Sequence, residues 1–171
     1  MHTNIDAADQ MIDHLGDLLR MTLHSSGTQE VALTRELDVL QKYLEIERAR
    51  FGDRLNVTVE LGPACSEVPV PALMLQPIVE NAVVHAIAPR ARGGSIRIGA
   101  RRRTGFLEVE VDDDGPGPGA PERIYRDGHG LSNVRERLKT LYGEEGSISI
   151  RTRAQGGTSV MFRLPVTPPW T

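Results

Sequence analysis

The segment LQPIVENAVVHA (Leu75–Ala86) constrains the fold more than any other part of the chain. Its apolar residues recur at intervals of three and four, which predicts an amphipathic helix with one buried stripe. Asn81 and His85 are four positions apart, so they lie on one helix face and can contact the same ligand. A carboxamide beside an imidazole suits a hydrated cation or a phosphate. Taken alone, however, the segment favours a buried asparagine that is hydrogen-bonded locally.

The composition indicates a soluble globular protein, with 39% apolar and 25% charged residues. A net charge of -3 gives no general attraction to nucleic acid or to a membrane surface. The single cysteine, Cys65, excludes a disulfide framework within one chain and a multi-cysteine metal site. No run approaches the roughly 18 apolar residues of a membrane span, and no signal peptide follows Met1. We therefore expect a cytoplasmic location.

The first third of the sequence predicts two amphipathic helices. One covers Ile5–Leu23 and the other follows Thr34 up to Phe51, with Ser25-Ser26-Gly27 between them. The resulting helical hairpin needs a partner surface, either the rest of the chain or a second copy. We assign residues 1–52 to this helical segment, 53–166 to a second domain and 167–171 to a tail.

The second domain alternates strands with helices. Period-two patterns predict five strands: Leu55–Leu61, Ser95–Ala100, Phe106–Asp112, Ser147–Thr152 and Thr158–Leu164. Leu131–Tyr142 is predicted to be helical, and Cys65–Val68 a short additional strand. We expect Pro71 in the first turn of the Leu75–Ala86 helix and a kink near Leu73–Met74 caused by Pro77. This order favours an α+β fold, a two-layer α/β sandwich with a mixed sheet on one side and helices on the other.

The sequence DDDGPG places a carboxylate, Asp113, at the end of a predicted strand. Gly115 and Gly117 permit positive φ and the close approach of a flat ligand. A buried carboxylate there would select adenine, whose edge offers an amino donor, over guanine, which offers a carbonyl acceptor. A simple Asp/Gly turn is the alternative interpretation.

Gly128-His129-Gly130-Leu131 opens the second predicted helix of this domain. Free amides at a helix N-terminus form an anion site, although a flexible connector with a cap explains the segment equally well. Arg135 and Arg137 follow within two turns and are more often solvated than bound to phosphate. Gly156-Gly157-Thr158 is primarily a hairpin turn, with Thr158 facing a ligand as the second interpretation.

These four features occur in a fixed order that resembles the N, G1 and G2 boxes and the closing GGT of the Bergerat ATP-binding fold, which gyrase, MutL and histidine kinases share. LMLQPIVENAVVHA and GHGLSNVRERL are similar to the boxes of LytS-type sensor histidine kinases. YLEIERARFGDRL and MIDHLGDLLRMTL are also similar to that family, so the resemblance covers nearly the whole chain.

The resemblance implies that the second domain binds ATP together with Mg²⁺. Asn81 would bind Mg²⁺ through its amide oxygen, Asp113 would hold the adenine amino group, and His85 would reach the phosphates. Gly128 and Gly130 would cradle phosphates and hinge a lid at residues 118–127. The implied ATP-binding residues are Asn81, His85, Asp113, Gly115, Gly117, Gly128, Gly130, Leu131 and Thr158.

Three residues depart from the family pattern. Val84 stands where lysine is common, Ala86 replaces the usual glycine, and Asp114 replaces the asparagine beside Asp113. We expect nucleotide binding to be kept but weakened.

The family carries its phosphoacceptor histidine in a PHFLFN-like segment before the first helix. None of the five histidines of this chain has that context. The expectation is therefore a fragment of a longer protein, without the sensor and membrane-spanning parts and without autophosphorylation in isolation.

The leading functional hypothesis is the catalytic portion of a sensor histidine kinase. It would transfer the γ-phosphoryl group of ATP to a histidine outside this segment, for onward transfer to a response regulator, within a homodimeric protein anchored in the membrane. An ATP-hydrolysing switch of the gyrase or MutL type is a second hypothesis, but the water-activating glutamate of those proteins is replaced here by Pro77. A serine kinase of the anti-sigma type or a non-enzymatic interaction module is the third, and the helical hairpin fits the sensor-kinase layout better than either.

Overall fold

A computed structural model describes residues 30–117 and 129–166 of the chain. The predicted helix Ile5–Leu23, the predicted lid, Gly128 and the predicted tail lie outside the described residues. The chain divides into two compact units, residues 1–30 and 31–171, and the description below concerns the second.

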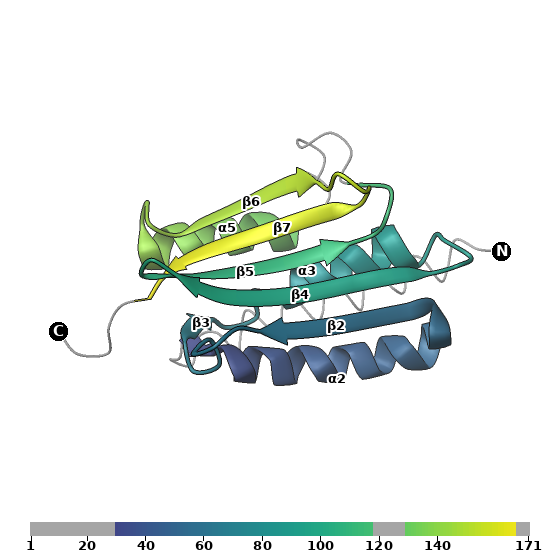
Figure 1. The fold of residues 1–171 in the computed structure, drawn as a ribbon, viewed down its shortest axis with the longest axis horizontal. Helices are drawn as coiled ribbons and strands as arrows, with labels where there is room; N and C mark the ends of the chain where they lie inside the picture. Colours follow the sequence, from purple (N-terminus) through teal and green to yellow (C-terminus); the bar gives the residue numbers. More distant parts are fainter. Residues whose placement is uncertain (1–29, 118–128, 167–171) are drawn as a thin grey trace. The chain divides into compact units, whose positions relative to one another are not determined.

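Five strands form one mixed sheet in the order β2-β4-β5-β7-β6 (Figure 1). They are β2 (Leu55–Leu61), β4 (Gly94–Arg103), β5 (Phe106–Asp113), β6 (Ser147–Thr152) and β7 (Thr158–Pro165). β2 pairs parallel with β4, and the other pairs are antiparallel. A small second sheet pairs β1 (Glu30–Ala32) with β3 (Pro69–Pro71). All five predicted strands of the main sheet are therefore confirmed.

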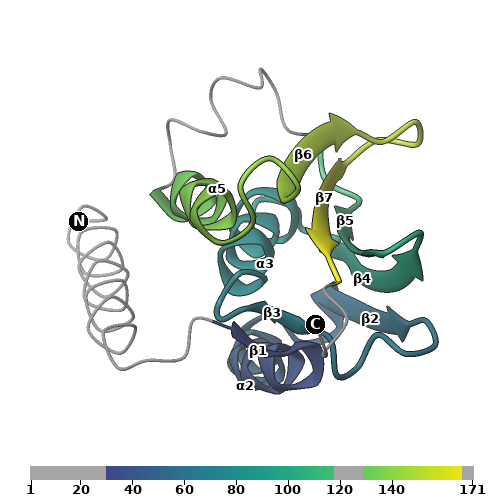
Figure 2. The ribbon, with the colours of Figure 1, turned by 90° about the vertical axis from the view of Figure 1, so that its left-hand side faces the viewer.

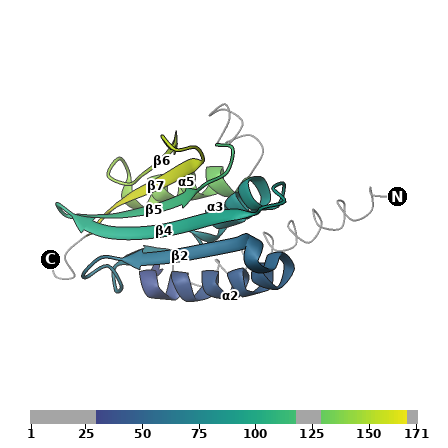
Figure 3. The ribbon, with the colours of Figure 1, turned by 45° about the vertical axis from the view of Figure 1, so that its right-hand side comes forward.

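The helices lie along one face of the main sheet, which confirms the two-layer α/β sandwich (Figure 2). α2 (Leu33–Phe51), followed by the short 3₁₀ segment η2 (Gly52–Arg54), runs alongside β2 (Figure 3). α3 (Gln76–Ala82) continues into the π-helical η3 (Val83–Ile87). α5 (His129–Tyr142) comes between β5 and β6 in the sequence. Among the described helices, none is long and apolar enough to cross a membrane.

α2 shares its hydrophobic core with the sheet. Leu33, Leu40 and Leu44 are almost completely buried in the same cluster as the inward-facing residues of the strands. The second helix of the predicted hairpin thus packs on the rest of the chain, while its first helix is outside the described residues. The predicted domain boundary at residue 52 stays a prediction.

The core lies between the helices and the inner face of the sheet. Alternation along β5 places Leu107, Val109 and Val111 on this inner face, where each is at most 2% exposed. The neighbouring strands supply the remaining inner-face residues, namely Ile96, Ile98 and Ala100 from β4 and Val160, Phe162 and Leu164 from β7.

The chain between β2 and α3 differs from the prediction. Cys65–Val68 forms a turn, in which the Val68 amide donates to the Cys65 carbonyl at 3.2 Å, rather than a strand. The short strand comes later and contains Pro71, so Pro71 is not in a helical turn. The helix begins only at Gln76, which puts Pro77 at its first positions and produces no kink. A proline there is favourable because its missing N–H would have no partner in the helix anyway.

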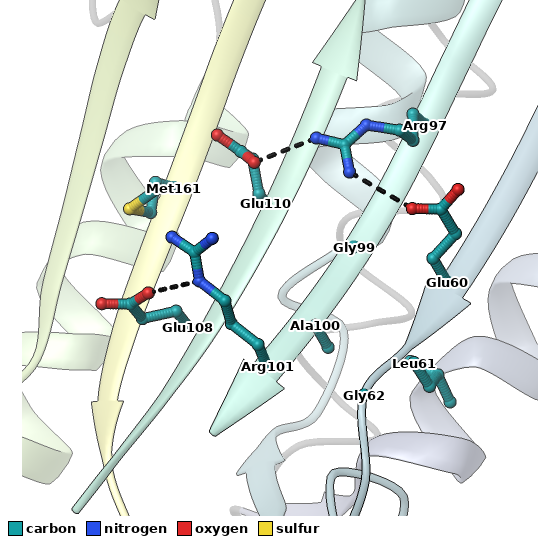
Figure 4. Close-up of a pocket in the computed structure, with 10 residues that line it drawn as sticks. All are labelled: Glu60, Leu61, Gly62, Arg97, Gly99, Ala100, Arg101, Glu108, Glu110 and Met161. Carbon is teal, nitrogen blue, oxygen red and sulfur yellow. Dashed lines mark hydrogen bonds and ion pairs between the residues drawn. The ribbon is translucent and has the colours of Figure 1, made fainter. Parts of the chain in front are cut away.

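The outer face of the sheet carries a set of ion pairs (Figure 4). Glu108 lies opposite Arg101, and Asp112 opposite Arg97, in the β4–β5 register, and opposite charges at such positions stabilise a sheet. Glu110 contacts two arginines, Arg97 at 3.0 Å and Arg151 at 2.6 Å. Gly99 leaves room beside these side chains for a shallow pocket of about 330 Å³. This pocket opens on the face opposite the helices and away from the candidate site below.

Glu110 provides a test of this charged face. Burial disfavours its charged form, but hydrogen bonds from Ser159, Arg151 and Arg97 outweigh burial and lower the pKa of Glu110 below its ordinary 4.5. A carboxylate with a lowered pKa stabilises the fold above pH 4.5, and that contribution is lost as the pH falls through the folded-state pKa. Glu110→Gln should therefore lower the free energy of unfolding by about 1–3 kcal/mol at neutral pH and by much less near pH 3, as measured by urea denaturation.

Glu108→Gln is the matched control. Glu108 forms its ion pair with the exposed Arg101, so its replacement should cost less than about 1 kcal/mol. An equal loss for Glu110→Gln at neutral and acid pH would contradict the assigned role of its charge.

Candidate functional site

Asp113 is the last residue of β5 and follows the inner-face row of apolar side chains. It is only 8% exposed. Its Oδ1 accepts hydrogen bonds from the backbone amides of Gly115 at 2.8 Å and Thr158 at 3.2 Å. Oδ2 makes no hydrogen bond with a described residue. The carboxylate is thus fixed in orientation through one oxygen, and the other oxygen can accept from a ligand.

Two arginines that no sequence motif identified hold the loop after Asp113. The Arg153 guanidinium donates to the Asp113 carbonyl at 2.8 Å. Arg90 donates to the Asp114 carbonyl at 2.8 Å and to its carboxylate at 2.6 Å. Burial opposes the charge of Asp114, but hydrogen bonds from the Ser95 backbone and from Arg90 lower its pKa below the ordinary value. The aspartate in place of the family's asparagine therefore has an ionic partner that keeps it charged.

Close backbone contacts explain why glycines stand at two of these positions. A methyl group on Gly115 would lie 2.5 Å from the Ala86 Cβ, so the loop after β5 packs directly against η3. A methyl group on Gly157 would lie 2.0 Å from the Asp113 carbonyl oxygen. The contacts bring together the end of β5, the helix formed by α3 and η3 (called the N-box helix below) and the β6–β7 turn, as the motif order implied.

The helix face that carries Asn81 meets the start of α5. A methyl group on Gly130 would lie 2.8 Å from Pro77 Cβ, so these two residues are in close contact. Asn81 is four residues after Pro77 and lies on the same face, about 6 Å further along the helix axis. Asn81 is half-buried, and its carboxamide makes no hydrogen bond with another described residue. It is therefore available to a ligand next to the N-terminus of α5.

His85 and Leu131 have different surroundings from Asn81. His85 is exposed and lies in η3, where the Ala88 amide donates to the Val83 carbonyl at 2.9 Å. This wider turn rotates His85 relative to the position that an α-helix would give it, and π-helical turns often occur at functional sites. Leu131 is 3% exposed and packs in the core, so only its backbone amide at the start of α5 faces a ligand position.

Among the remaining candidates, Gly117 has a φ of +95°, in the region that favours glycine, and Thr158 contacts Asp113 through its amide. Arg137 donates to the Ala72 carbonyl at 2.7 Å. Ala72 precedes α3 and is not among the residues that were predicted to bind phosphate. Among the residues with defined positions, no group of three His, Cys, Asp or Glu side chains could hold a metal ion. A divalent cation at Asn81 would therefore depend on phosphate oxygens and water for its other ligands, as Mg²⁺ commonly does.

Gly156 and Gly157 offer a matched pair of substitutions, because both have positive φ, +87° and +94°. A methyl group on Gly156 would lie 4.0 Å from the Gly115 carbonyl oxygen, an ordinary van der Waals contact, so Gly156→Ala should cost only the backbone strain, about 1 kcal/mol. Gly157→Ala adds the clash with the Asp113 carbonyl and should cost about 3 kcal/mol or more in the free energy of unfolding. Chemical denaturation of both variants measures the difference, and equal losses would show that the contact does not constrain this turn.

The chain resembles curated sensor histidine kinases over most of its length. It is 35% identical to the sensor histidine kinase YpdA of Escherichia coli (strain K12) over 169 residues, 95% of this chain and 29% of that protein. It is 34% identical to the sensor histidine kinase YesM of Bacillus subtilis (strain 168) over 158 residues, 91% of this chain and 27% of that protein. The chain therefore spans less than a third of the length of these relatives.

Solved histidine kinase structures share the fold. The catalytic domain of histidine kinase ThkA superposes with a TM-score of 0.63 at 22% identity, covering 81% of this chain and 97% of that domain. Histidine kinase AdeS of Acinetobacter baumannii gives a TM-score of 0.67 at 14% identity, covering 94% of this chain and 81% of that one.

Two family models match consecutive parts of the sequence. The histidine kinase model matches residues 1–55. The model of histidine kinase-, DNA gyrase B- and HSP90-like ATPases matches residues 71–168, more than half of the chain. These matches agree with the motif order and the fold. The chain therefore belongs to the family of histidine kinase-, DNA gyrase B- and HSP90-like ATPases, in the branch that contains the sensor histidine kinases.

Proposed function

We propose that this chain is the ATP-binding catalytic part of a sensor histidine kinase, which binds Mg-ATP and transfers the γ-phosphoryl group to a histidine residue. The observation that carries this proposal is the Asp113 carboxylate, buried at a strand end and oriented by two backbone amides. Its second oxygen is an acceptor that matches the amino group of adenine. Guanine would place a carbonyl oxygen there and leave the carboxylate unpaired, so the site favours adenine.

The phosphate end of the nucleotide would lie between α3 and α5. The first amides of α5 have no partners within the helix and carry its positive dipole end, which attracts phosphate. Asn81 lies on the adjacent helix face and supplies an amide oxygen for Mg²⁺. When bound, Mg²⁺ would offset the negative charge of the phosphates. The contribution of the chain's own groups is to fix the nucleotide in position and to stabilise charge, which are the main sources of catalysis in phosphoryl transfer.

Two residues favour phosphoryl transfer over rapid hydrolysis. Pro77 occupies the position from which a glutamate activates water in the gyrase-type switches, and a proline cannot act as a base. Glu80 is the nearest carboxylate on α3, and it accepts a hydrogen bond from Gln76 at 2.7 Å within its own helix. The histidine kinase match over residues 1–55 also favours this function over an anti-sigma-type serine kinase or an interaction module.

The proposal includes the wider context of a two-component system. ThkA, whose structure shares this fold, has been solved in complex with the response regulator protein TrrA. We propose a response regulator as the phosphate acceptor after the histidine, a homodimer in the full-length protein, and a cytoplasmic position with membrane anchoring through other segments. Nucleic acid is not an expected partner.

Asp113→Asn tests the adenine contact. The substitution keeps the size of the side chain but allows the amide to place a donor against the adenine amino group. The dissociation constant of Mg-ATP should rise at least about tenfold, equivalent to about 1.4 kcal/mol. Isothermal titration calorimetry measures it, with folding checked by circular dichroism.

Asp112→Asn is the control, because Asp112 is the adjacent residue on the outer face and pairs with Arg97. It can change stability but should leave the affinity of the folded protein for Mg-ATP unchanged. Unchanged affinity in Asp113→Asn would contradict the proposed nucleotide site.

Phosphate release separates the kinase from the hydrolysing switch. The chain alone should bind Mg-ATP but release inorganic phosphate at no more than a background rate, because Pro77 stands at the position of the water-activating base. A longer version of the protein that includes the residues preceding this segment should accumulate acid-labile phosphohistidine. Rapid, sustained phosphate release by the chain alone would favour the ATP-hydrolysing switch instead.

A further inference from the structure

A buried carboxylate outside the nucleotide site joins α2 to the segment that precedes α3. Glu36 lies in the first turn of α2 and is 3% exposed. Its Oε2 accepts a hydrogen bond from the Leu73 amide at 2.7 Å, and its Oε1 accepts one from the Leu75 amide at 2.9 Å. Each carboxylate oxygen therefore holds one backbone amide of the same short segment.

The segment Ala72–Leu75 needs such support because its backbone is unusual. Leu73 has a φ of +58°, a left-handed conformation that costs free energy in a residue other than glycine. Arg137 holds the same segment from the other side, since it comes from α5 and donates to the Ala72 carbonyl at 2.7 Å. Burial raises the pKa of Glu36, while the backbone hydrogen bonds and the charge of Arg137 act in the opposite direction.

We propose that Glu36 is a positioning residue for the nucleotide site: it fixes where α3 begins and thereby where Asn81 lies relative to the N-terminus of α5. This inference rests on the proposed function and adds a route by which α2 affects it. α3 starts one residue after Leu75, so a shift of the Leu75 amide moves the whole helix. Pro77 lies close enough to Gly130 that a shift of α3 would change the contact between α3 and α5.

The arrangement also crosses the boundary between the two family models. Glu36 lies in residues 1–55, matched by the histidine kinase model, whereas Asn81 and Gly130 lie in the region matched by the ATPase model. Glu36 and Arg137 hold one four-residue segment from two different helices. A displacement or rotation of α2 is therefore transmitted to the helix that carries Asn81, and the affinity for Mg-ATP depends on the position of α2.

Glu36→Gln tests this role, with Asp38→Asn on the exposed face of the same helix as the control. Glutamine keeps one acceptor oxygen but sets an NH₂ group against the other backbone amide. The folded variant should bind Mg-ATP about tenfold more weakly, while Asp38→Asn should bind like the wild type. A purely structural role would lower the melting temperature without changing the affinity of the molecules that remain folded. A folded Glu36→Gln variant with wild-type affinity would overturn the inference and leave the proposed function intact.

Hydrogen exchange in the wild-type chain provides a second test that does not depend on the folding of a variant. Saturation with Mg-ATP should slow exchange of the Leu73 and Leu75 amides, because nucleotide binding and the position of this segment are linked. The Thr34 amide, which donates to the Ser66 carbonyl at 3.0 Å, should be unaffected. Bound nucleotide without added protection at Leu73 and Leu75 would contradict the inference alone, whereas a wild-type chain that binds no Mg-ATP would contradict the proposed function as well.

Discussion

The structure depends on the burial of one carboxylate at the end of an otherwise apolar row. Leu107, Val109 and Val111 continue directly into Asp113 on the inner face of β5. A buried charge is tolerated only where hydrogen bonds replace its lost hydration. Two backbone amides, from Gly115 and from Thr158, do so for one oxygen. The two loops that supply these amides must therefore meet at the strand end, and they define the place where a ligand can bind.

The two faces of the sheet differ in polarity. The inner face is apolar and is covered by helices, and among its described residues Asp113 is the one carboxylate. Among the described residues, the outer face has no helix over it, and it carries arginines and carboxylates that pair across strands. Arg153 links the two faces, because its guanidinium donates to the Asp113 carbonyl and lies 3.9 Å from the Asp112 carboxylate. The charged outer face thus contributes to the position of the loop on the inner side.

Local patterns in the sequence predicted most of the fold. Period-two alternation identified all five strands of the main sheet, and the motif order brought the Asp113 loop, the N-box helix and the Gly156-Gly157 turn into one region. The errors arose around Pro77, which we expected inside a helix, where it would cause a kink. Leu73 has a left-handed backbone conformation, and the helix begins only after it. Pro77 is therefore one of the first residues of the helix. Arg90, Arg153 and Glu36 had no sequence signal. Their partners are backbone groups 24 to 40 residues away, and only the tertiary fold brings them together.

We propose that Asp113 makes this chain selective for adenine nucleotides. Calorimetric titration of the wild-type chain with ATP and with GTP, each in the presence of Mg²⁺, tests it most directly, because the two ligands differ only in the base. The wild-type chain should bind ATP measurably and GTP at least about a hundredfold more weakly, since guanine would leave the buried carboxylate unpaired. Equal affinities for the two nucleotides would contradict it.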